Sequence, residues 1–293
     1  MIIHELLVGA VASLIASGRQ DTPQLDAELL LAYCLQRARS FLFTYPEFEL
    51  TRDICQQFQG LLARRLKGEP IAYILGHKEF WGLDLLSTPA ALMPRAETEL
   101  LVERVLAVAP SQARILDLGT GSGAIALALA SERPSWQLVA TDISEEALQL
   151  AQQNADRLAL KNIHFYLGSW FAALPSEEPF DVIVSNPPYI AEGDPHLNHA
   201  TLQFEPYNAL VSGADGLDAI RAIIRQARRY LKPGGYLLLE HGHDQSVLIV
   251  ELLQAAGFLA EVFYDYQGIA RVVQTRSAAP ILAGKAWNAL KLS

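Results

Sequence analysis

Apolar side chains recur at helical spacing through the first 70 residues of the chain. One such run ends at Gly18, and a second begins behind Thr22 at Pro23, a residue suited to the first turn of a helix. A further helix is predicted after the capping residue Thr51, with these apolar residues on one face: Ile54, Phe58, Leu61 and Leu62. We expect a small helical bundle over residues 1–70, without chemistry of its own.

Residues 71–94 carry a different pattern of short apolar runs. Two of these runs, Ile71–Leu75 and Phe80–Leu86, flank the polar segment Gly76–Glu79. The pattern predicts a β-hairpin that joins two domains.

From about residue 95, short apolar runs alternate with helical ones. Strands are predicted at residues 114–118, 137–142, 163–167, 180–185, 236–240, 260–265 and 270–274. Helices are predicted at residues 124–132, 144–158 and 220–230, the last stopped by Lys232-Pro-Gly-Gly235. This alternation indicates an α/β domain with a mostly parallel sheet covered on both faces. The last two strands are too close for a helix between them, so we expect an antiparallel pair.

Composition narrows the class of protein. A length of 293 residues suggests two domains, and 51 % hydrophobic against 19 % charged residues indicates a globular chain. The net charge of −9 argues against binding mainly through phosphate neutralisation. Two cysteines, Cys34 and Cys55, are too few for a disulfide framework. No apolar stretch reaches the roughly 18 residues of a membrane span, and the first residues lack a secretory pattern, so a cytoplasmic protein without a membrane partner is expected.

A glycine-rich turn joins the first strand of the α/β domain to the next helix, in Ile115-Leu-Asp-Leu-Gly-Thr-Gly-Ser-Gly-Ala-Ile125. Glycines let the backbone turn sharply and approach a ligand, towards which the amides at the helix start point. Asp142, 23 residues after Gly119, can accept the hydroxyls of an adenosine ribose, or cap the helix opening at Ser144. An adenosine cofactor is therefore predicted; a dehydrogenase and a ligand-free turn stay open at this point.

The segment Val184-Ser-Asn-Pro-Pro-Tyr-Ile190 ends the fourth strand of this domain. In doubly wound sheets the first and fourth strands are neighbours, so Asn186 would share a pocket with the glycine turn. The Asn186 side-chain oxygen and the Pro187 carbonyl can accept the two N–H bonds of a planar NH2 group, and Tyr189 offers a flat face to stack on. The segment predicts methylation of an amino or amide nitrogen through positioning and electrostatics. The alternative is a turn that merely ends a strand.

Together, these motifs resemble the class I S-adenosylmethionine-dependent methyltransferases that act on exocyclic or amide nitrogens. Nearly the whole chain resembles one of their families, the peptide chain release factor glutamine methyltransferases, known as PrmC or HemK. Further segments carry this resemblance: Gly68-Glu-Pro-Ile-Ala-Tyr73, Glu79-Phe-Trp81, Pro94-Arg95 with Thr98-Glu99, Phe204-Glu-Pro206 and Leu239-Glu-His-Gly242.

The resemblance implies a seven-stranded Rossmann-like sheet with its last strand antiparallel. It divides the chain into a substrate-recognition domain (1–70), a hairpin link (71–94), a methyltransferase domain (95–276) and a tail (277–293). S-adenosylmethionine would be the methyl donor, with S-adenosylhomocysteine as product. The acceptor would be the glutamine of the Gly-Gly-Gln motif in class I release factors, whose methylation tunes translation termination.

The same resemblance assigns site residues. Those implied to bind the cofactor are Gly119, Thr120, Gly121, Ser122, Gly123, Asp142, Trp170 (flanking the adenine) and Asn186. Those implied to bind the substrate are Asn186, Pro187, Pro188 and Tyr189, of which Asn186, Pro187 and Tyr189 are the catalytic set. No metal is implied, and a monomer is expected.

Two positions depart from the family pattern. Ala96 stands where the family often has Pro, and Ser169 stands where it often has an acidic residue that would bond the adenine amino group. The rival function is a nucleic-acid adenine methyltransferase, which applies the Asn186 chemistry to a flipped base. The acidic net charge and the lack of a dense basic groove count against that rival.

Overall fold

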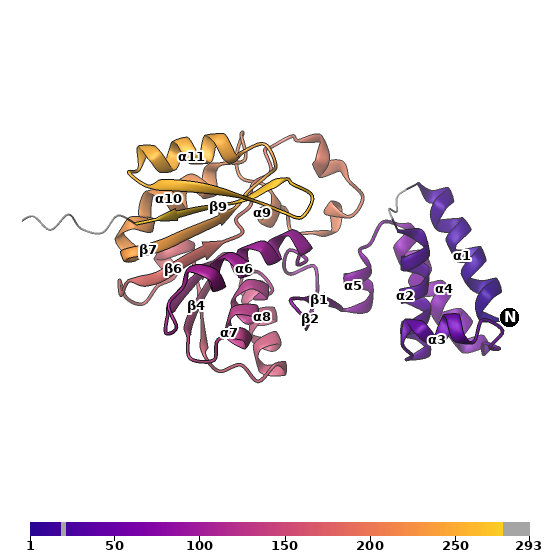
Figure 1. The fold of residues 1–293 in the computed structure, drawn as a ribbon. Coiled ribbons are helices and arrows are strands. Elements are labelled where there is room, and N and C mark those ends of the chain that lie inside the picture. The colour runs from indigo at the N-terminus through magenta and orange to yellow at the C-terminus, as the bar shows by residue number, and fades with distance from the viewer. Residues whose placement is uncertain (19–21, 278–293) are drawn as a thin grey trace, which may run out of the picture.

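A computed structural model describes residues 1–18 and 22–277 of the chain. Two bodies of unequal size are joined by a narrow link (Figure 1). The smaller, N-terminal body is helical, and the larger one is built on a seven-stranded sheet. The tail predicted over residues 277–293 lies outside the described residues, apart from Ser277.

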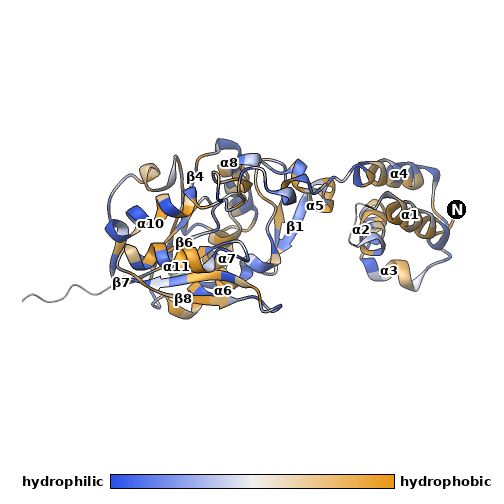
Figure 2. Ribbon diagram, turned by 90° about the horizontal axis from the view of Figure 1, so that it is seen from above, coloured by the Kyte–Doolittle hydropathy of each residue, from blue (hydrophilic) through white to orange (hydrophobic). Residues whose placement is uncertain are grey.

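The helical body is a bundle with an apolar interior. Its helices are α1 (Ile3–Ser17), α2 (Pro23–Leu35), α3 (Arg39–Thr44) and α4 (Arg52–Leu66). Gly18 ends α1 in the left-handed conformation, and Thr51 caps α4 by accepting a hydrogen bond from the Ile54 amide, as predicted. Leu30 and Phe58 are fully buried between the helices, whose inward faces are apolar in Figure 2. Burial of these faces stabilises the bundle.

Helix α2 also buries two acidic side chains. Asp26 accepts a hydrogen bond from Arg65 Nε at 2.7 Å, and both side chains are almost fully buried. Glu28 pairs with Arg39 at 2.8 Å. The ion pair of Asp26 with Arg65 therefore fixes α2 against α4 inside the bundle.

The link contains a hairpin, but its strands begin later than the sequence predicts. Residues 71–75 form the short helix α5 (Ile71–Leu75) instead of a strand. Most of the polar segment that was expected to form the turn belongs instead to the first strand, β1 (His77–Phe80). This strand pairs antiparallel with the second strand, β2 (Leu83–Leu86). Trp81 and Gly82 make the turn with φ of 52° and 72°, which is the backbone of a tight two-residue hairpin.

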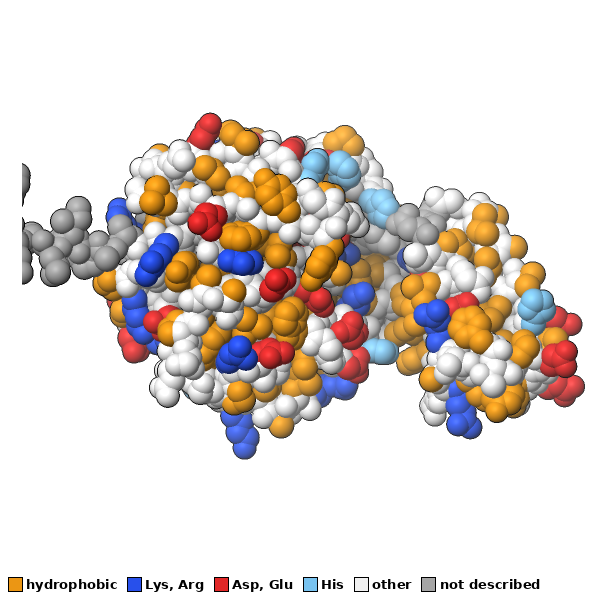
Figure 3. All heavy atoms as spheres, viewed as in Figure 1, with side chains coloured by type: hydrophobic (Ala, Val, Ile, Leu, Met, Phe, Trp, Pro, Cys, Tyr) orange, Lys and Arg blue, Asp and Glu red, His pale blue; other side chains and the backbone are white. Residues whose placement is uncertain are grey.

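The two bodies form separate masses with a hollow between them (Figure 3). Gly68, just after α4, lies against Ala200 of the larger body, and a Cβ at Gly68 would come within 3.0 Å of the Ala200 Cβ. Gly68 also has a φ of 100°, so a side chain there would be strained. The end of the bundle therefore contacts the larger body.

The larger body confirms the predicted α/β class. Its strands are β3 (Arg114–Leu118), β4 (Gln137–Asp142), β5 (Ile163–Leu167), β6 (Phe180–Ser185), β7 (Leu231–Glu240), β8 (Leu259–Tyr264) and β9 (Ala270–Arg276). They lie in the order β5-β4-β3-β6-β7-β9-β8, with β9 antiparallel to both neighbours. The segment 232–235, predicted as a helix stop, lies inside β7, where the pairing with β6 shifts register.

Helices cover both faces of this sheet. On one face pack α6 (Glu99–Val108), α7 (Ala124–Glu132) and α8 (Glu145–Arg157). On the other pack α10 (Asp218–Tyr230) and α11 (Ser246–Ala255). The short α9 (Tyr207–Leu210) lies in the long connection from β6 to α10. Neighbouring residues of one strand enter opposite cores, as Ile115 and Leu116 do.

The strand order reverses between β3 and β6. These two strands are parallel neighbours, with Leu118 opposite Ser185 in the register. The glycine turn that follows β3 and Asn186, which follows β6, are therefore brought to the same edge of the sheet. This confirms the predicted neighbourhood of the first and fourth strands.

Candidate active site

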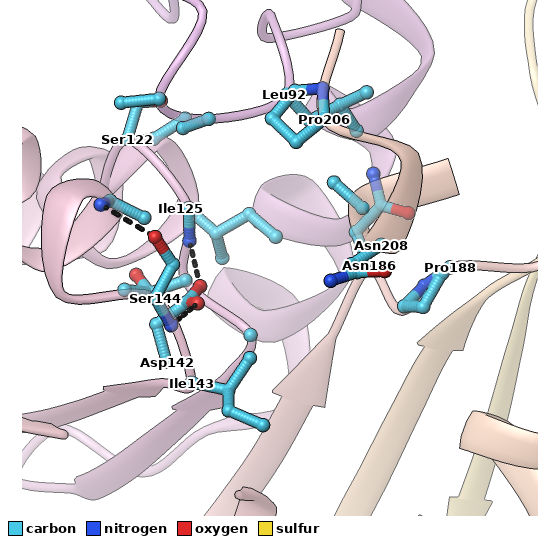
Figure 4. A pocket seen from close by; sticks show the side chains of 18 of the residues that line it. Leu92, Ser122, Ile125, Asp142, Ile143, Ser144, Asn186, Pro188, Pro206 and Asn208 are labelled. Carbon is cyan, nitrogen blue, oxygen red and sulfur yellow. Dashed lines mark hydrogen bonds between the residues drawn. The ribbon is translucent and has the colours of Figure 1, made fainter. Parts of the chain in front are cut away.

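A cavity of about 580 Å³ lies over the carboxyl ends of β3, β4 and β6. Most of the residues predicted for cofactor and substrate line it: Gly119, Thr120, Gly121, Ser122, Asp142, Trp170, Asn186 and Pro188. Three others are not among the lining residues: Gly123, Pro187 and Tyr189. Figure 4 shows Asp142 and Ser144 on one wall, with Asn186, Pro188 and Asn208 across the cavity.

The glycine turn is held to the end of β4 by a carboxylate. Asp142 Oδ2 accepts a hydrogen bond from the Gly121 amide at 2.8 Å, and Oδ1 accepts one from the Ser144 amide at 2.9 Å. Burial raises the pKa of Asp142, and these backbone bonds oppose that rise. The hydroxyl that caps α8 is that of Ser144, which accepts from the Ala147 amide, so Asp142 shapes the turn and is not itself the cap.

A second carboxyl lies beneath the same turn. Asp117 is 1 % exposed and accepts a hydrogen bond from Thr120 Oγ1 at 2.6 Å through Oδ2. Its Oδ1 is buried and has no hydrogen-bond partner among the described residues. Burial raises the pKa of Asp117 to about 7. Asp117 stands in the glycine-rich motif but is not among the site residues predicted from the sequence.

Two of the glycines are required for different reasons. A Cβ at Gly119 would lie 3.3 Å from Cζ3 of Trp170, so the indole packs directly against the turn. A Cβ at Gly123 would lie 2.9 Å from Leu127 Cδ1 and 3.1 Å from Ala151 Cβ. Both glycines also have positive φ. Gly119 therefore permits the wall that Trp170 forms, whereas Gly123 permits close packing of α7 and α8.

Asn186 presents a buried acceptor at the opposite wall. Its Nδ2 donates a hydrogen bond to Thr98 Oγ1 at 3.1 Å. Its Oδ1 is buried and has no hydrogen-bond partner among the described residues. A buried acceptor without a partner is unfavourable unless a ligand supplies the donor. The arrangement suits a ligand N–H group.

Pro187 and Tyr189, unlike Pro188, do not line the cavity. Pro187 is buried, and the Tyr189 phenol donates to Glu240 Oε1 at 3.4 Å. The Tyr189 carbonyl accepts a hydrogen bond from Gln245 Nε2 at 2.9 Å. Burial raises the pKa of Tyr189, so its phenol stays protonated at neutral pH. These contacts hold the segment rigidly against β7 and the loop that follows it.

An ion pair at the cavity was not foreseen as part of the site. Arg95, a lining residue, pairs with the buried carboxylate of Glu205, whose Oε2 also accepts from the Met93 amide at 3.3 Å. Burial raises the pKa of Glu205, and the charge of Arg95 opposes that rise. Both residues stand in segments quoted for the family resemblance, but spacing along the chain gave no sign that they meet. Pro206 and Asn208 line the cavity beside them.

The sequence holds two close pairs of histidines, His196 with His199 and His241 with His243. Within residues 1–18 and 22–277, no three His, Cys, Asp or Glu side chains gather closely enough to hold a metal ion. His241 is buried after β7, and its Nδ1 donates to the Gly242 carbonyl at 2.7 Å. In the same part of the chain, no helix combines the length and apolarity needed to cross a membrane.

Comparison with known families matches both bodies of the chain. Residues 110–277 match the family described as a methyltransferase domain, and residues 5–76 match the PrmC N-terminal domain. The release factor glutamine methyltransferase of Coxiella burnetii is 51 % identical over 259 residues, which cover 87 % of this chain and 92 % of that protein. The Escherichia coli K12 protein of the same name is 48 % identical over 269 residues, covering 91 % and 96 %.

The fold also recurs among solved structures. A methyltransferase from Pyrococcus furiosus superposes with a TM-score of 0.52 at 20 % identity, over 67 % of this chain and 90 % of that one. At this identity the likeness shows a shared fold.

Proposed function

The chain belongs to the family of release factor glutamine methyltransferases, and we propose that it methylates the glutamine of the Gly-Gly-Gln motif in class I peptide chain release factors. The methyl group would pass from S-adenosylmethionine to the side-chain amide nitrogen. The observation that carries this proposal is Asn186, whose Oδ1 is a buried acceptor without a hydrogen-bond partner among the described residues and whose side chain lines the cavity.

The cavity residues on the β3 and β4 side fit S-adenosylmethionine, which supplies an electrophilic sulfonium methyl when bound. The turn from Gly119 to Ser122 lines the cavity and offers close backbone approach for the methionine part. The amides of Gly119, Thr120 and Gly121 already donate within the protein, to the Thr141 carbonyl and the Asp142 carboxylate, and so hold the turn in shape. Asp142 retains acceptor lone pairs for ribose hydroxyls besides its two backbone bonds. Trp170 would flank the adenine. Gly123 supports this side of the cavity because it permits the close packing of α7 and α8.

On the other side, the chain would hold the substrate amide. Asn186 Oδ1 and the Pro187 carbonyl would each accept one N–H bond of the glutamine NH2 group. These two bonds would orient and polarise a nitrogen whose lone pair is otherwise delocalised into the amide. Pro188 lines the cavity there, and Tyr189, held by Glu240, would support the plane of the amide. Catalysis would then rest on positioning and electrostatics.

The helical body is proposed to recognise the release factor while the glutamine enters the cavity. The match of residues 5–76 to the PrmC N-terminal domain supports this division, with residues 71–94 as the link and 95–276 as the methyltransferase domain. A monomer is proposed as the working unit. A release factor substrate supports action in the cytoplasm.

A transfer assay tests the proposal. The protein is incubated with methyl-labelled S-adenosylmethionine and, in separate arms, a class I release factor, the same factor with its loop glutamine replaced by alanine, and DNA. Label should appear on the intact factor alone. Equal label on the glutamine-replaced factor would refute the site of methylation, and label on DNA would favour adenine methylation instead.

A further inference from the structure

One cationic side chain lines the cavity of the candidate active site. Among the described residues that line it, Asp142 and Glu146 are acidic, and Arg95 is the only one that carries a positive charge. The Arg95 side chain is 30 % exposed, so its guanidinium is not sealed off by the protein. An anionic group bound in this cavity would therefore find its counter-charge at Arg95.

A buried carboxylate holds Arg95 by one nitrogen. Arg95 Nη2 donates to Oε1 of Glu205, whose side chain is fully buried, and Glu205 Oε2 accepts from the Met93 amide at 3.3 Å. In the part of the chain that the structure describes, Nε and Nη1 of Arg95 have no hydrogen-bond partner. Glu205 thus restricts the side chain, while other N–H groups of the rigid guanidinium fork are left for a ligand.

The segment that carries Arg95 lies against the glycine turn. All residues from Ala90 to Arg95 line the cavity, and a Cβ at Gly121 would lie 3.8 Å from the Ala91 Cβ. In Figure 4, Leu92 of this segment lies at the end of the cavity away from Ile143, the residue that follows the proposed ribose ligand. Arg95 therefore belongs to the wall beside the proposed place of the methionine part.

The turn itself has few donors left for an anion. The amides of Gly119 and Thr120 donate to the Thr141 carbonyl, and the Gly121 amide donates to the Asp142 carboxylate. The methionine part of S-adenosylmethionine ends in a carboxylate. A carboxylate that leaves water for a cavity needs new hydrogen-bond donors or a cation, and the turn alone does not supply them.

We propose that Arg95 binds the carboxylate of the methionine part of S-adenosylmethionine, through the N–H groups that Glu205 leaves free. Hydrogen bonds between a guanidinium and a carboxylate are charge-assisted and among the strongest in proteins. They would also offset the repulsion of that carboxylate by Asp142 and Glu146. The proposal rests on the proposed function for its choice of cofactor, and it adds the residue that holds the end of the cofactor farthest from the adenine.

Calorimetry with two ligands tests this contact without any release factor. Decarboxylated S-adenosylmethionine lacks only the carboxylate, and the wild-type protein should bind it at least tenfold more weakly than S-adenosylmethionine. In Arg95→Met, the Kd for S-adenosylmethionine should rise at least tenfold, while the Kd for the decarboxylated ligand should rise by less than threefold. The variant should therefore bind the two ligands about equally.

Two further variants guard against indirect effects. Arg95→Met leaves the buried Glu205 without its cation, so the double variant Arg95→Met with Glu205→Gln removes both charges and should lose discrimination between the ligands to the same extent. Arg221 pairs with Asp215 and does not line the cavity. Arg221→Met removes the same charge from the surface and should keep the wild-type ratio of the two Kd values.

Three results would overturn the inference. Equal weakening of both ligands in Arg95→Met and in the double variant would mean that Arg95 only shapes the cavity. An unchanged Kd for S-adenosylmethionine in Arg95→Met, with a raised KM for the release factor, would assign Arg95 to the protein substrate. Equal binding of the two ligands by the wild type would mean that the carboxylate has no partner.

The outcome is independent of the methyl acceptor. If the wild-type protein discriminates between the ligands as expected and Arg95→Met does not, the contact with the carboxylate is supported even where no methyl group reaches the release factor. That combination would refute the proposed acceptor and leave the role of Arg95 standing.

Discussion

The Gly121 amide donates a hydrogen bond of 2.8 Å to Asp142 Oδ2, which ties the turn after β3 to the end of β4. The same carboxylate accepts from the Ser144 amide, so both of its oxygens already have backbone partners in the free protein. The proposed ribose-binding residue therefore also shapes the turn that would face the methionine part of the cofactor. Such preorganisation reduces the ordering that binding would otherwise require.

This double role predicts a strong effect of Asp142→Ala on cofactor binding. The variant loses the bond to the turn and the acceptors for the ribose, each a charge-assisted interaction worth about 1.5–3 kcal/mol. The Kd for S-adenosylmethionine, measured by calorimetry, should rise at least tenfold. The matched control is Asp156→Asn on the exposed side of α8, which should bind normally. Equal affinity in both variants would remove Asp142 from the binding site.

Asn186→Ala should separate binding of the cofactor from transfer of its methyl group. The variant removes the acceptor proposed to orient the glutamine nitrogen, but it leaves the Gly121 and Asp142 wall untouched. Methyl transfer to the release factor should fall below detection, while the Kd for S-adenosylmethionine stays within a few-fold. Turnover within a few-fold of wild type would show that the amide-binding role is wrong.

The sequence predicts the order of the strands in the larger body and the helices α7, α8 and α10, because periodicity changes clearly there from strand to helix. It does not predict α6 or α11. It fails at Ile71–Leu75, because five apolar residues do not distinguish a short helix from a strand. Tertiary contacts decide the matter: Tyr73 is buried, and its phenol donates to the Ala91 carbonyl at 2.9 Å. Strand β1 is mostly polar and exposed, so it shows no alternation of apolar and polar positions.

Only part of the candidate site could likewise be predicted from the sequence. Site residues that are close together in the sequence, such as those of the glycine turn, can be recognised from the sequence alone. The partner of Asn186 cannot, because Thr98 precedes it by 88 residues and contacts it only when α6 and β6 pack together. The pair of Arg95 with Glu205 likewise joins residues 110 positions apart. Such contacts require the fold before their chemistry can be inferred.

Replacing different glycines of the turn should lower the free energy of unfolding by different amounts. Gly123→Ala would place a Cβ 2.9 Å from Leu127 Cδ1 at a φ of 86°, whereas the nearest contact of a Cβ at Gly121 is Ala91 at 3.8 Å. Both changes incur backbone strain of about 1 kcal/mol or more, and only Gly123→Ala adds overpacking of about 1–3 kcal/mol. Denaturant unfolding should rank Gly123→Ala as clearly less stable. The reverse order would contradict the packing role of Gly123.

Asp26→Asn tests whether the helical body recognises the release factor while the larger body binds the cofactor. The change weakens a buried ion pair between α2 and α4, and removing one partner of such a pair costs about 3–5 kcal/mol. The helical body should therefore lose stability, and KM for the release factor should rise. The Kd for S-adenosylmethionine should stay at the wild-type value, because the cavity lies wholly in the other body and its link. A matching loss of cofactor affinity would contradict the separate roles.

The buried Asp117 should make the folded protein less stable as pH rises through neutrality. Burial raises its folded-state pKa to about 7, well above the ordinary value that it regains on unfolding. The folded state therefore holds a proton that the unfolded state has already lost, and this favourable contribution disappears as pH rises towards and past 7. Glu240, whose pKa is also raised to about 7, acts in the same direction.

Urea unfolding at several pH values between 5 and 8.5 measures this dependence. The free energy of unfolding of Asp117→Asn should fall less steeply with pH than that of the wild type, because an amide binds no proton in either state. Asp215→Asn is the matched control: its pairing with Arg221 lowers the pKa of Asp215 to about 2, so it is ionised throughout this range in both states. The control should keep the wild-type slope. A wild-type slope in Asp117→Asn as well would mean that Asp117 is already ionised in the folded protein, and that the hydrogen bond from the Thr120 hydroxyl stabilises its charge enough to offset the loss of solvent.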